Sequence, residues 1–88
     1  MTNLKNDLQA DAVGNLYRAA FYLAKSEQIL ALNFLKKATQ KIPKENLKSL
    51  KPLLDNPKFN LSSKIKEKYW AEKILDEYKI LLNQINYC

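Results

Sequence analysis

The sequence predicts an all-α fold, an antiparallel bundle of four helices in which the third helix is short. Its 88 residues contain one Gly and three Pro, too few for the turns that an all-β chain needs about every dozen positions. Apolar residues make up 47% of the chain, which argues against disorder, and they recur at the three- and four-residue steps of a helix. A chain of this length allows one domain, which we assign to residues 1–88.

Residues 4–25 are predicted to form one long helix, because apolar or small residues recur at helical spacing without an internal proline. One line of them is Leu8, Ala12, Leu16, Ala19 and Leu23. A second line is Ala10, Gly14, Tyr17, Phe21 and Ala24. Together they form an apolar arc wider than the roughly 100° that a surface helix needs. This helix is therefore expected either to lie at the centre of the bundle or to serve two interfaces.

Gly14 distinguishes the second line from an ordinary core stripe. In mid-helix it costs about 0.5–1 kcal/mol relative to Ala, and its spacing of four from Ala10 lets another backbone approach closely. The line therefore predicts an interface of Ala10, Gly14, Tyr17 and Phe21, through which two copies form a symmetric homodimer. The alternative is that a single bundle buries both lines inside itself.

A second helix is predicted from Ser26, as its N-cap, to about Ile42. Because the joint to the first helix is short, the two helices should form an antiparallel hairpin. The expected core stripe is Leu30, Ala31, Phe34, Leu35, Ala38 and Ile42.

Pro43 ends the second helix and leads into a short third helix from Lys44 to about Lys51. Pro52 and the turn signal Asp55-Asn56-Pro57 then break the pattern, so residues 58–61 are predicted to be an extended connection. Two apolar residues of this connection, Phe59 and Leu61, are expected to anchor it to the core.

The last helix is predicted from Ser62 or Ser63 to near Asn86. Its amphipathic stripe is Trp70, Ala71, Ile74, Leu75, Tyr78, Leu81, Leu82 and Ile85. Tyr69 and Ile80 lie off this stripe, and Lys68 and Glu72 form a four-residue charge pair on the solvent side.

Small, aromatic and Pro residues stand at fixed offsets in the first hairpin: Ala19, Tyr22, Ala31, Ala38 and Pro43. In these positions residues 12–45 resemble one tetratricopeptide-type unit, a helix-turn-helix of about 34 residues. The resemblance implies a tightly packed antiparallel hairpin and a family whose members usually bind other proteins. Leu35 stands where that pattern has an aromatic. Other departures, where it has tryptophan, leucine, glycine and tyrosine, are Asn15, Arg18, Ser26 and Gln28.

After Pro43 no second copy of this pattern appears at the right period. Tetratricopeptide arrays normally need about three copies, so an array is excluded. The alternative is that any antiparallel helix pair with alanines at its crossing gives part of the same pattern.

The residue types exclude most enzyme chemistry. The chain has no His, and its one Cys is the last residue, Cys88, so the usual general base, the common zinc-ligand sets and an internal disulfide are absent. Ser hydroxyls have no His to activate them, and Gly14 alone cannot form a phosphate loop. The carboxylates are interpreted as helix-surface acids. We therefore expect no enzyme activity, no cofactor and no metal site.

The chain is basic, with a formal net charge of +6. The segment 36–68 contains ten Lys against three acids and is the candidate surface for an anionic partner. The residues expected to contact such a partner are Lys44, Lys48, Lys51, Lys64, Lys66 and Lys68. Arg18 is the single Arg, whereas base recognition favours Arg. Solvated surface lysines are the alternative, and Trp70 is expected in the core rather than on a stacking platform.

These observations favour a small, non-catalytic protein-interaction or adaptor module that self-associates through its first helix, with the basic segment contacting an acidic partner. The alternative is a nucleic-acid-binding protein that uses the lysines of segment 36–68 against phosphates. A polar start and the absence of any apolar run near roughly 18 residues predict a cytoplasmic protein without membrane contact.

Overall fold

Five α-helices and one 3-10 helix follow one another along the described backbone, which confirms the all-α prediction. The structure, a computed structural model, describes the backbone of residues 2–86 and the side chains of residues 11–43 and 46–83. The elements are α1 (Thr2–Ala24), α2 (Gln28–Lys41), the 3-10 helix η1 (Lys44–Leu50), α3 (Lys51–Asp55), α4 (Pro57–Asn60) and α5 (Lys64–Asn86).

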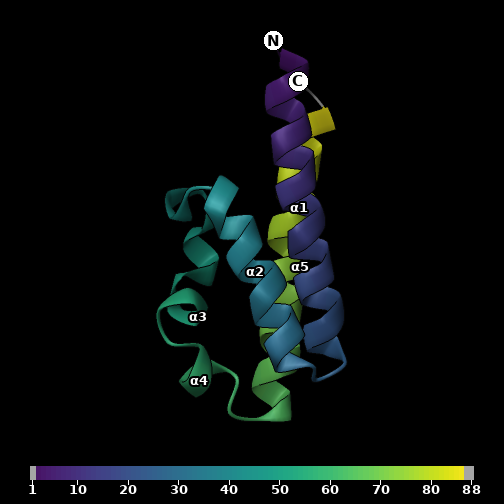
Figure 1. Cartoon of the computed structure of the whole chain (residues 1–88). Helices are drawn as coiled ribbons and strands as arrows, with labels where there is room; N and C mark the ends of the chain where they lie inside the picture. The colour runs from purple at the N-terminus through teal and green to yellow at the C-terminus, as the bar shows by residue number, and fades with distance from the viewer. Residues whose placement is uncertain (1, 87–88) are drawn as a thin grey trace.

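Helix α1 lies at the centre and packs against both α2 and α5 (Figure 1). Both neighbours run antiparallel to it, so the bundle consists of three long helices. The short elements η1, α3 and α4 carry the chain from the end of α2 to the start of α5 and pack against one another and against α5. Because α2 is shorter, α1 and α5 continue together past its end, which gives a molecule of 43 × 21 × 18 Å.

The core forms along the first apolar line of α1, as predicted. Its described members, Ala12, Leu16, Ala19 and Leu23, are all buried. Leu8 lies outside the described side chains. Buried alanines stand on both α1 and α2, which pack against each other, and small side chains let two helix backbones approach closely. The buried partners from the rest of the described chain are Ala31, Leu35, Ala38, Ile42, Leu47, Leu50, Leu53, Leu61, Trp70, Ala71 and Ile74.

The start of α2 differs from the prediction. Ser26 is not the N-cap, because its backbone has φ of +63° and belongs to the turn that leaves α1. Glu27 occupies the N-cap position and makes no side-chain capping bond. Leu30 was also wrongly placed in the core stripe: it is exposed, because its neighbour Ala31 faces α1 and successive helix residues turn by about 100°.

The segment between α2 and α5 is more helical than predicted. The expected third helix is a 3-10 helix with non-helical backbone at Leu47, and Pro52 does not break the chain but stands in the first turn of α3. The extended connection predicted at 58–61 is wrong, since α4 occupies it. Pro starts such short helices because their first N–H groups need no partner. Of the two expected anchors, Leu61 is buried and Phe59 is largely exposed.

One buried charged side chain ties the α1–α2 turn to α5. Glu67 is 6% exposed, and its carboxylate accepts hydrogen bonds from Ser26 Oγ at 2.9 Å and from Gln28 Nε2. Gln28 Nε2 also donates to the carbonyl oxygen of Leu61 at 2.7 Å. Glu67 therefore ties the turn to the first turns of α5, and Gln28 ties the loop at Leu61 to the same cluster.

Variants of Ser26 test how much this hydrogen bond to Glu67 stabilises the fold. Ser26→Ala is expected to lower the free energy of unfolding by about 1–2 kcal/mol, because it removes a hydrogen bond to a buried carboxylate and keeps a positive φ. Ser26→Gly loses the same bond but relieves the backbone, so it should cost clearly less. Urea denaturation compares the two. Equal losses in both variants would contradict this account of the turn.

An exposed ion pair joins the end of α2 to α1, with Lys41 Nζ 2.9 Å from Asp11 Oδ2. The hydrogen bond and charge of Lys41 hold the pKa of Asp11 below its usual value. A lowered pKa means that the pair stabilises the fold above the ordinary Asp pKa of about 4 and stops doing so as the pH falls through the lowered value. The small stability difference between the wild type and Lys41→Met should therefore vanish in acid. A difference that persists or grows there would contradict the assignment.

Candidate functional site

A hollow of about 300 Å³ opens between α1 and α5, and we call it the α1–α5 groove. Its lining is Tyr17, Ala20, Phe21 and Ala24 from α1 with Lys68, Ala71, Glu72 and Leu75 from α5. Each helix contributes a small, buried residue to the lining, Ala20 from α1 and Ala71 from α5, and their short side chains leave the space of the hollow open. A hollow of this volume lies at the lower end of the range of small-molecule sites, about 300–1,000 Å³.

The second apolar line of α1 forms the wall of this groove and is not part of the core. Tyr17 is 48% exposed and Phe21 is 44% exposed. Gly14 is half-buried, and a Cβ atom added there would meet Arg18 Nη1 at 3.4 Å. The expectation that a single bundle buries both lines is therefore wrong for these residues. The side chain of Ala10 lies outside the described residues.

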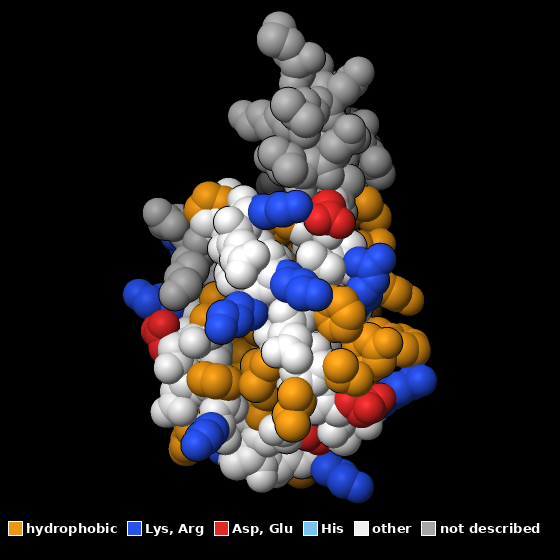
Figure 2. Space-filling view, viewed as in Figure 1, with side chains coloured by type: hydrophobic (Ala, Val, Ile, Leu, Met, Phe, Trp, Pro, Cys, Tyr) orange, Lys and Arg blue, Asp and Glu red, His pale blue; other side chains and the backbone are white. Residues whose placement is uncertain are grey.

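Aromatic contacts join this side of α1 to both neighbouring helices, α5 and α2. Tyr17 lies against Tyr78 of α5 with ring centroids 5.3 Å apart. Phe21 meets Tyr22 edge-on at 5.4 Å, and Tyr22 stacks on Phe34 of α2 at 5.5 Å. We call these five residues the aromatic face. Hydrophobic side chains gather along α1 in Figure 2, with Lys and Arg side chains around them. Rings in mutual contact are preorganised, so binding to them costs little side-chain entropy.

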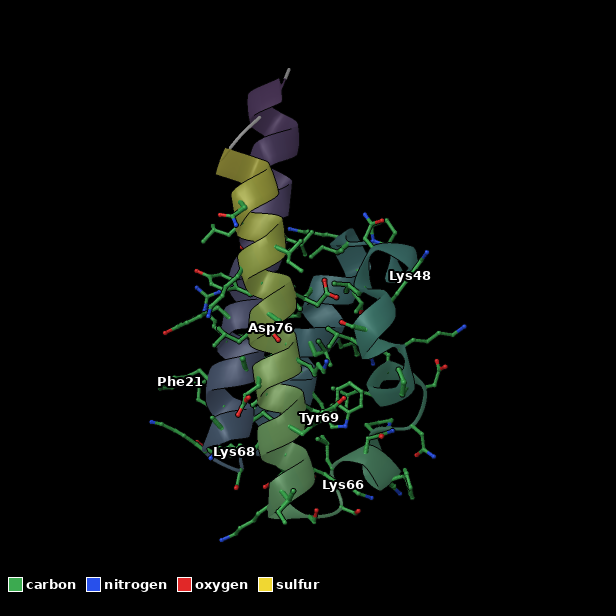
Figure 3. The ribbon with its side chains drawn as sticks, turned by 180° about the vertical axis from the view of Figure 1, so that it is seen from behind. Phe21, Lys48, Lys66, Lys68, Tyr69 and Asp76 are labelled. Carbon is green, nitrogen blue, oxygen red and sulfur yellow. The ribbon has the colours of Figure 1, made fainter. Side chains whose placement is uncertain are left out.

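The charges at the groove are mixed. Lys68 and Glu72 stand one turn apart on α5 and both line the groove. In the turn after α1, the exposed Lys25 places Nζ 4.4 Å from the centre of the Phe21 ring. In Figure 3, Phe21 and Lys68 lie on one side of the bundle and Lys48 and Lys66 on the other.

The lysines expected to contact an anionic partner are not brought into one patch. Lys64, Lys66 and Lys68 follow one another at steps of two in α5, and such steps turn by about 200° around a helix. Lys66 Nζ lies over the Phe59 ring and donates to the Phe59 carbonyl oxygen at 3.3 Å. Lys48 and Lys51 are exposed on η1 and α3. The side chain of Lys44 is not among those described.

Other candidate chemistry finds no grouping in the described part of the chain. Within it, no three His, Cys, Asp or Glu side chains gather to hold a metal ion. Trp70 is buried and so offers no platform for a stacked base. None of the helices described for residues 2–86 has the length and apolar character needed to cross a membrane.

Comparison with protein-family models, with curated proteins and with solved structures gives no match to this chain.

The sequence indicated only one side of the α1–α5 groove. The spacing of Gly14, Tyr17 and Phe21 indicated one wall, whereas Lys68 and Glu72 were interpreted as a solvent-side charge pair. A signal existed in Ala71, a small residue in the stripe of α5, but its partner Ala20 becomes apparent only when the two helices are aligned.

Proposed function

We propose that the chain is a non-catalytic protein-interaction module that self-associates, two copies pairing through the α1–α5 groove and the aromatic face. The observation that supports this most is the half-exposed pair Tyr17 and Phe21 beside an apolar hollow. Interfaces are enriched in aromatic residues, and their strongest contacts are aromatic side chains seated in pockets. The resemblance of residues 12–45 to a tetratricopeptide-type hairpin adds a weaker argument in the same direction.

A second copy fits this surface because the surface is complementary to itself. A two-fold interface brings one patch against its own copy, so it needs a projection and a recess side by side. Phe21 projects next to the groove that would receive the Phe21 ring of the other copy. If the two α5 helices run antiparallel about an axis between residues 68 and 72, Lys68 of each copy faces Glu72 of the other.

Charge reversal tests this pairing. Lys68→Glu and Glu72→Lys should each weaken the dimer about tenfold, since each places like charges together twice per dimer. The double variant Lys68→Glu/Glu72→Lys restores opposite charges and should return the dissociation constant to within about twofold of the wild type. Sedimentation equilibrium measures all four proteins.

The control pair is Lys51 and Asp55, which have the same spacing and charges on α3, away from the groove. Lys51→Glu and Asp55→Lys should leave the dissociation constant unchanged. A double groove variant that is no tighter than the single ones, or control variants that weaken the dimer equally, would overturn the proposed arrangement.

Gly14→Ala should separate stability from association. Among the described side chains the added methyl meets the flexible end of Arg18, so the isolated chain should become more stable by about 0.5–1 kcal/mol. Gly14 continues the second apolar line one turn before Tyr17, and we include it in the proposed interface, so in the dimer the same methyl should meet the other copy and weaken association. Thermal unfolding of dilute protein and sedimentation equilibrium measure the two effects. Association that tightens with stability would contradict a role for Gly14 at the interface.

Salt distinguishes self-association from the alternative proposal, phosphate binding by segment 36–68. Two chains of charge +6 repel, and salt screens this repulsion, so the dimer should tighten between low and physiological salt. Binding to nucleic acid should weaken steeply over the same range. Phosphate binding has less support, because Lys48 and Lys66 face away from Lys68 (Figure 3).

A further inference from the structure

A second and larger hollow, of about 450 Å³, lies between α2 and the segment formed by α3 and α4. Its apolar lining is Leu32 and Leu35 from α2 with Leu53, Leu54 and Pro57. We call it the α2–α3 pocket. It shares no lining residue with the α1–α5 groove, so a ligand in this pocket would bind independently of self-association. Its volume lies within the range of small-molecule sites, about 300–1,000 Å³.

The polar lining of this pocket has one sign of charge. Among the side chains that the structure describes, Lys36 is the single charged residue of the lining, and Thr39 and Gln40 are the neutral polar ones. Thr39 Oγ1 donates its hydrogen to the Lys36 carbonyl oxygen at 2.9 Å. In Figure 2 a Lys or Arg side chain lies over the hydrophobic side chains between α2 and α3. A ligand that matches this lining has an apolar body and one anionic group.

We propose that the α2–α3 pocket binds a medium-chain aliphatic carboxylate, with the chain against the four leucines and the carboxylate beside the Lys36 ammonium. A volume of about 450 Å³ lies in the lower half of the range of small-molecule sites, which suits a chain of about eight to twelve carbons. Leu35 and Leu53 are buried, whereas Leu32 and Leu54 are half-buried and offer apolar area to a ligand. Covering this area supplies the affinity, and the ion pair selects the head group.

A chain-length series tests the apolar part of the proposal. Hexanoate, heptanoate and octanoate are titrated into the full chain, and binding is followed by amide chemical shifts. Each added methylene should tighten binding about two- to fourfold. The shifts should centre on Leu32, Lys36 and Leu54. Shifts centred on Ala20 and Ala71 would place the ligand in the other groove and overturn the proposal, as would affinities independent of chain length.

The head group is tested by comparing octanoate with 1-octanol. Lys36→Met keeps the aliphatic part of the side chain and removes its charge, so it should weaken octanoate about threefold or more and leave 1-octanol unchanged. Lys37→Met is the control, because the Lys37 ammonium lies over the Phe34 ring instead. Equal losses in the two variants, or equal losses of both ligands, would show that Lys36 does not bind the carboxylate.

Leu54→Asn removes apolar surface from the lining of the α2–α3 pocket without removing a fully buried side chain. It should weaken octanoate and 1-octanol alike by about tenfold, because both lose apolar contact. Unchanged binding in a folded Leu54→Asn variant would overturn the proposal. Should this variant not fold, the Lys36 and Lys37 variants still decide it.

Discussion

Leu16→Ala is expected to lower the free energy of unfolding by about 2–5 kcal/mol, the largest loss of stability among the changes considered. Leu16 is fully buried in the helix that packs against both α2 and α5. Alanine would leave a cavity that neither neighbour fills without losing its own contacts. Domains of this size are stable by roughly 0.05–0.15 kcal/mol per residue, so this loss would remove a large part of the total.

Urea denaturation of dilute protein measures this loss, because association would otherwise add to the apparent stability. Leu30→Ala is the control: the same change on the exposed side of α2 should cost less than about 1 kcal/mol. Similar losses in both variants would contradict the placement of the core along the first line of α1.

Phe21→Ala is expected to weaken self-association about 100- to 1,000-fold while leaving the fold intact. A central aromatic contact contributes roughly 2 kcal/mol or more, and a two-fold dimer contains this contact twice. Phe21 is 44% exposed and lines the α1–α5 groove, so its removal should affect the core little. Sedimentation equilibrium gives the dissociation constant, and circular dichroism checks the helix content.

Tyr69→Ala is the matched control for Phe21→Ala. Tyr69 is an aromatic residue of α5 with 52% exposure, and it does not line the groove. Its loss should leave the dissociation constant within about twofold of the wild type. If Tyr69→Ala weakened the dimer as much as Phe21→Ala, the interface would have to lie elsewhere.

The long helices were predictable because their signals are local. An unbroken apolar period from Ala12 to Leu23 is enough to indicate both α1 and its buried side. The short elements were not, because local rules compete there: Pro52 and Pro57 were interpreted as breaks, whereas each stands at the start of a short helix.

The candidate site was predictable only on α1. The spacing of Gly14, Tyr17 and Phe21 defines one side of that helix, but the groove also depends on how α5 is rotated against it. No local pattern gives that rotation. Glu67 shows the same limit, since its partners Ser26 and Gln28 precede it by 41 and 39 residues.

The lysines show why charge along a sequence does not fix a surface. Segment 36–68 has a strong positive balance, yet it runs through α2, three short elements and the start of α5. Each turn between them changes the direction that the side chains face. As a result Lys48 and Lys68 lie on different sides of the molecule (Figure 3).

Self-association through the groove is tested most directly by sedimentation equilibrium over a hundredfold range of concentration, at physiological salt and with a reductant that prevents disulfides at Cys88. The wild type and Tyr69→Ala should rise from the mass of one chain to that of two, while Phe21→Ala should stay at one over the same range. A wild type that keeps the mass of one chain throughout, or a rise of equal extent in Phe21→Ala, would contradict the proposed function.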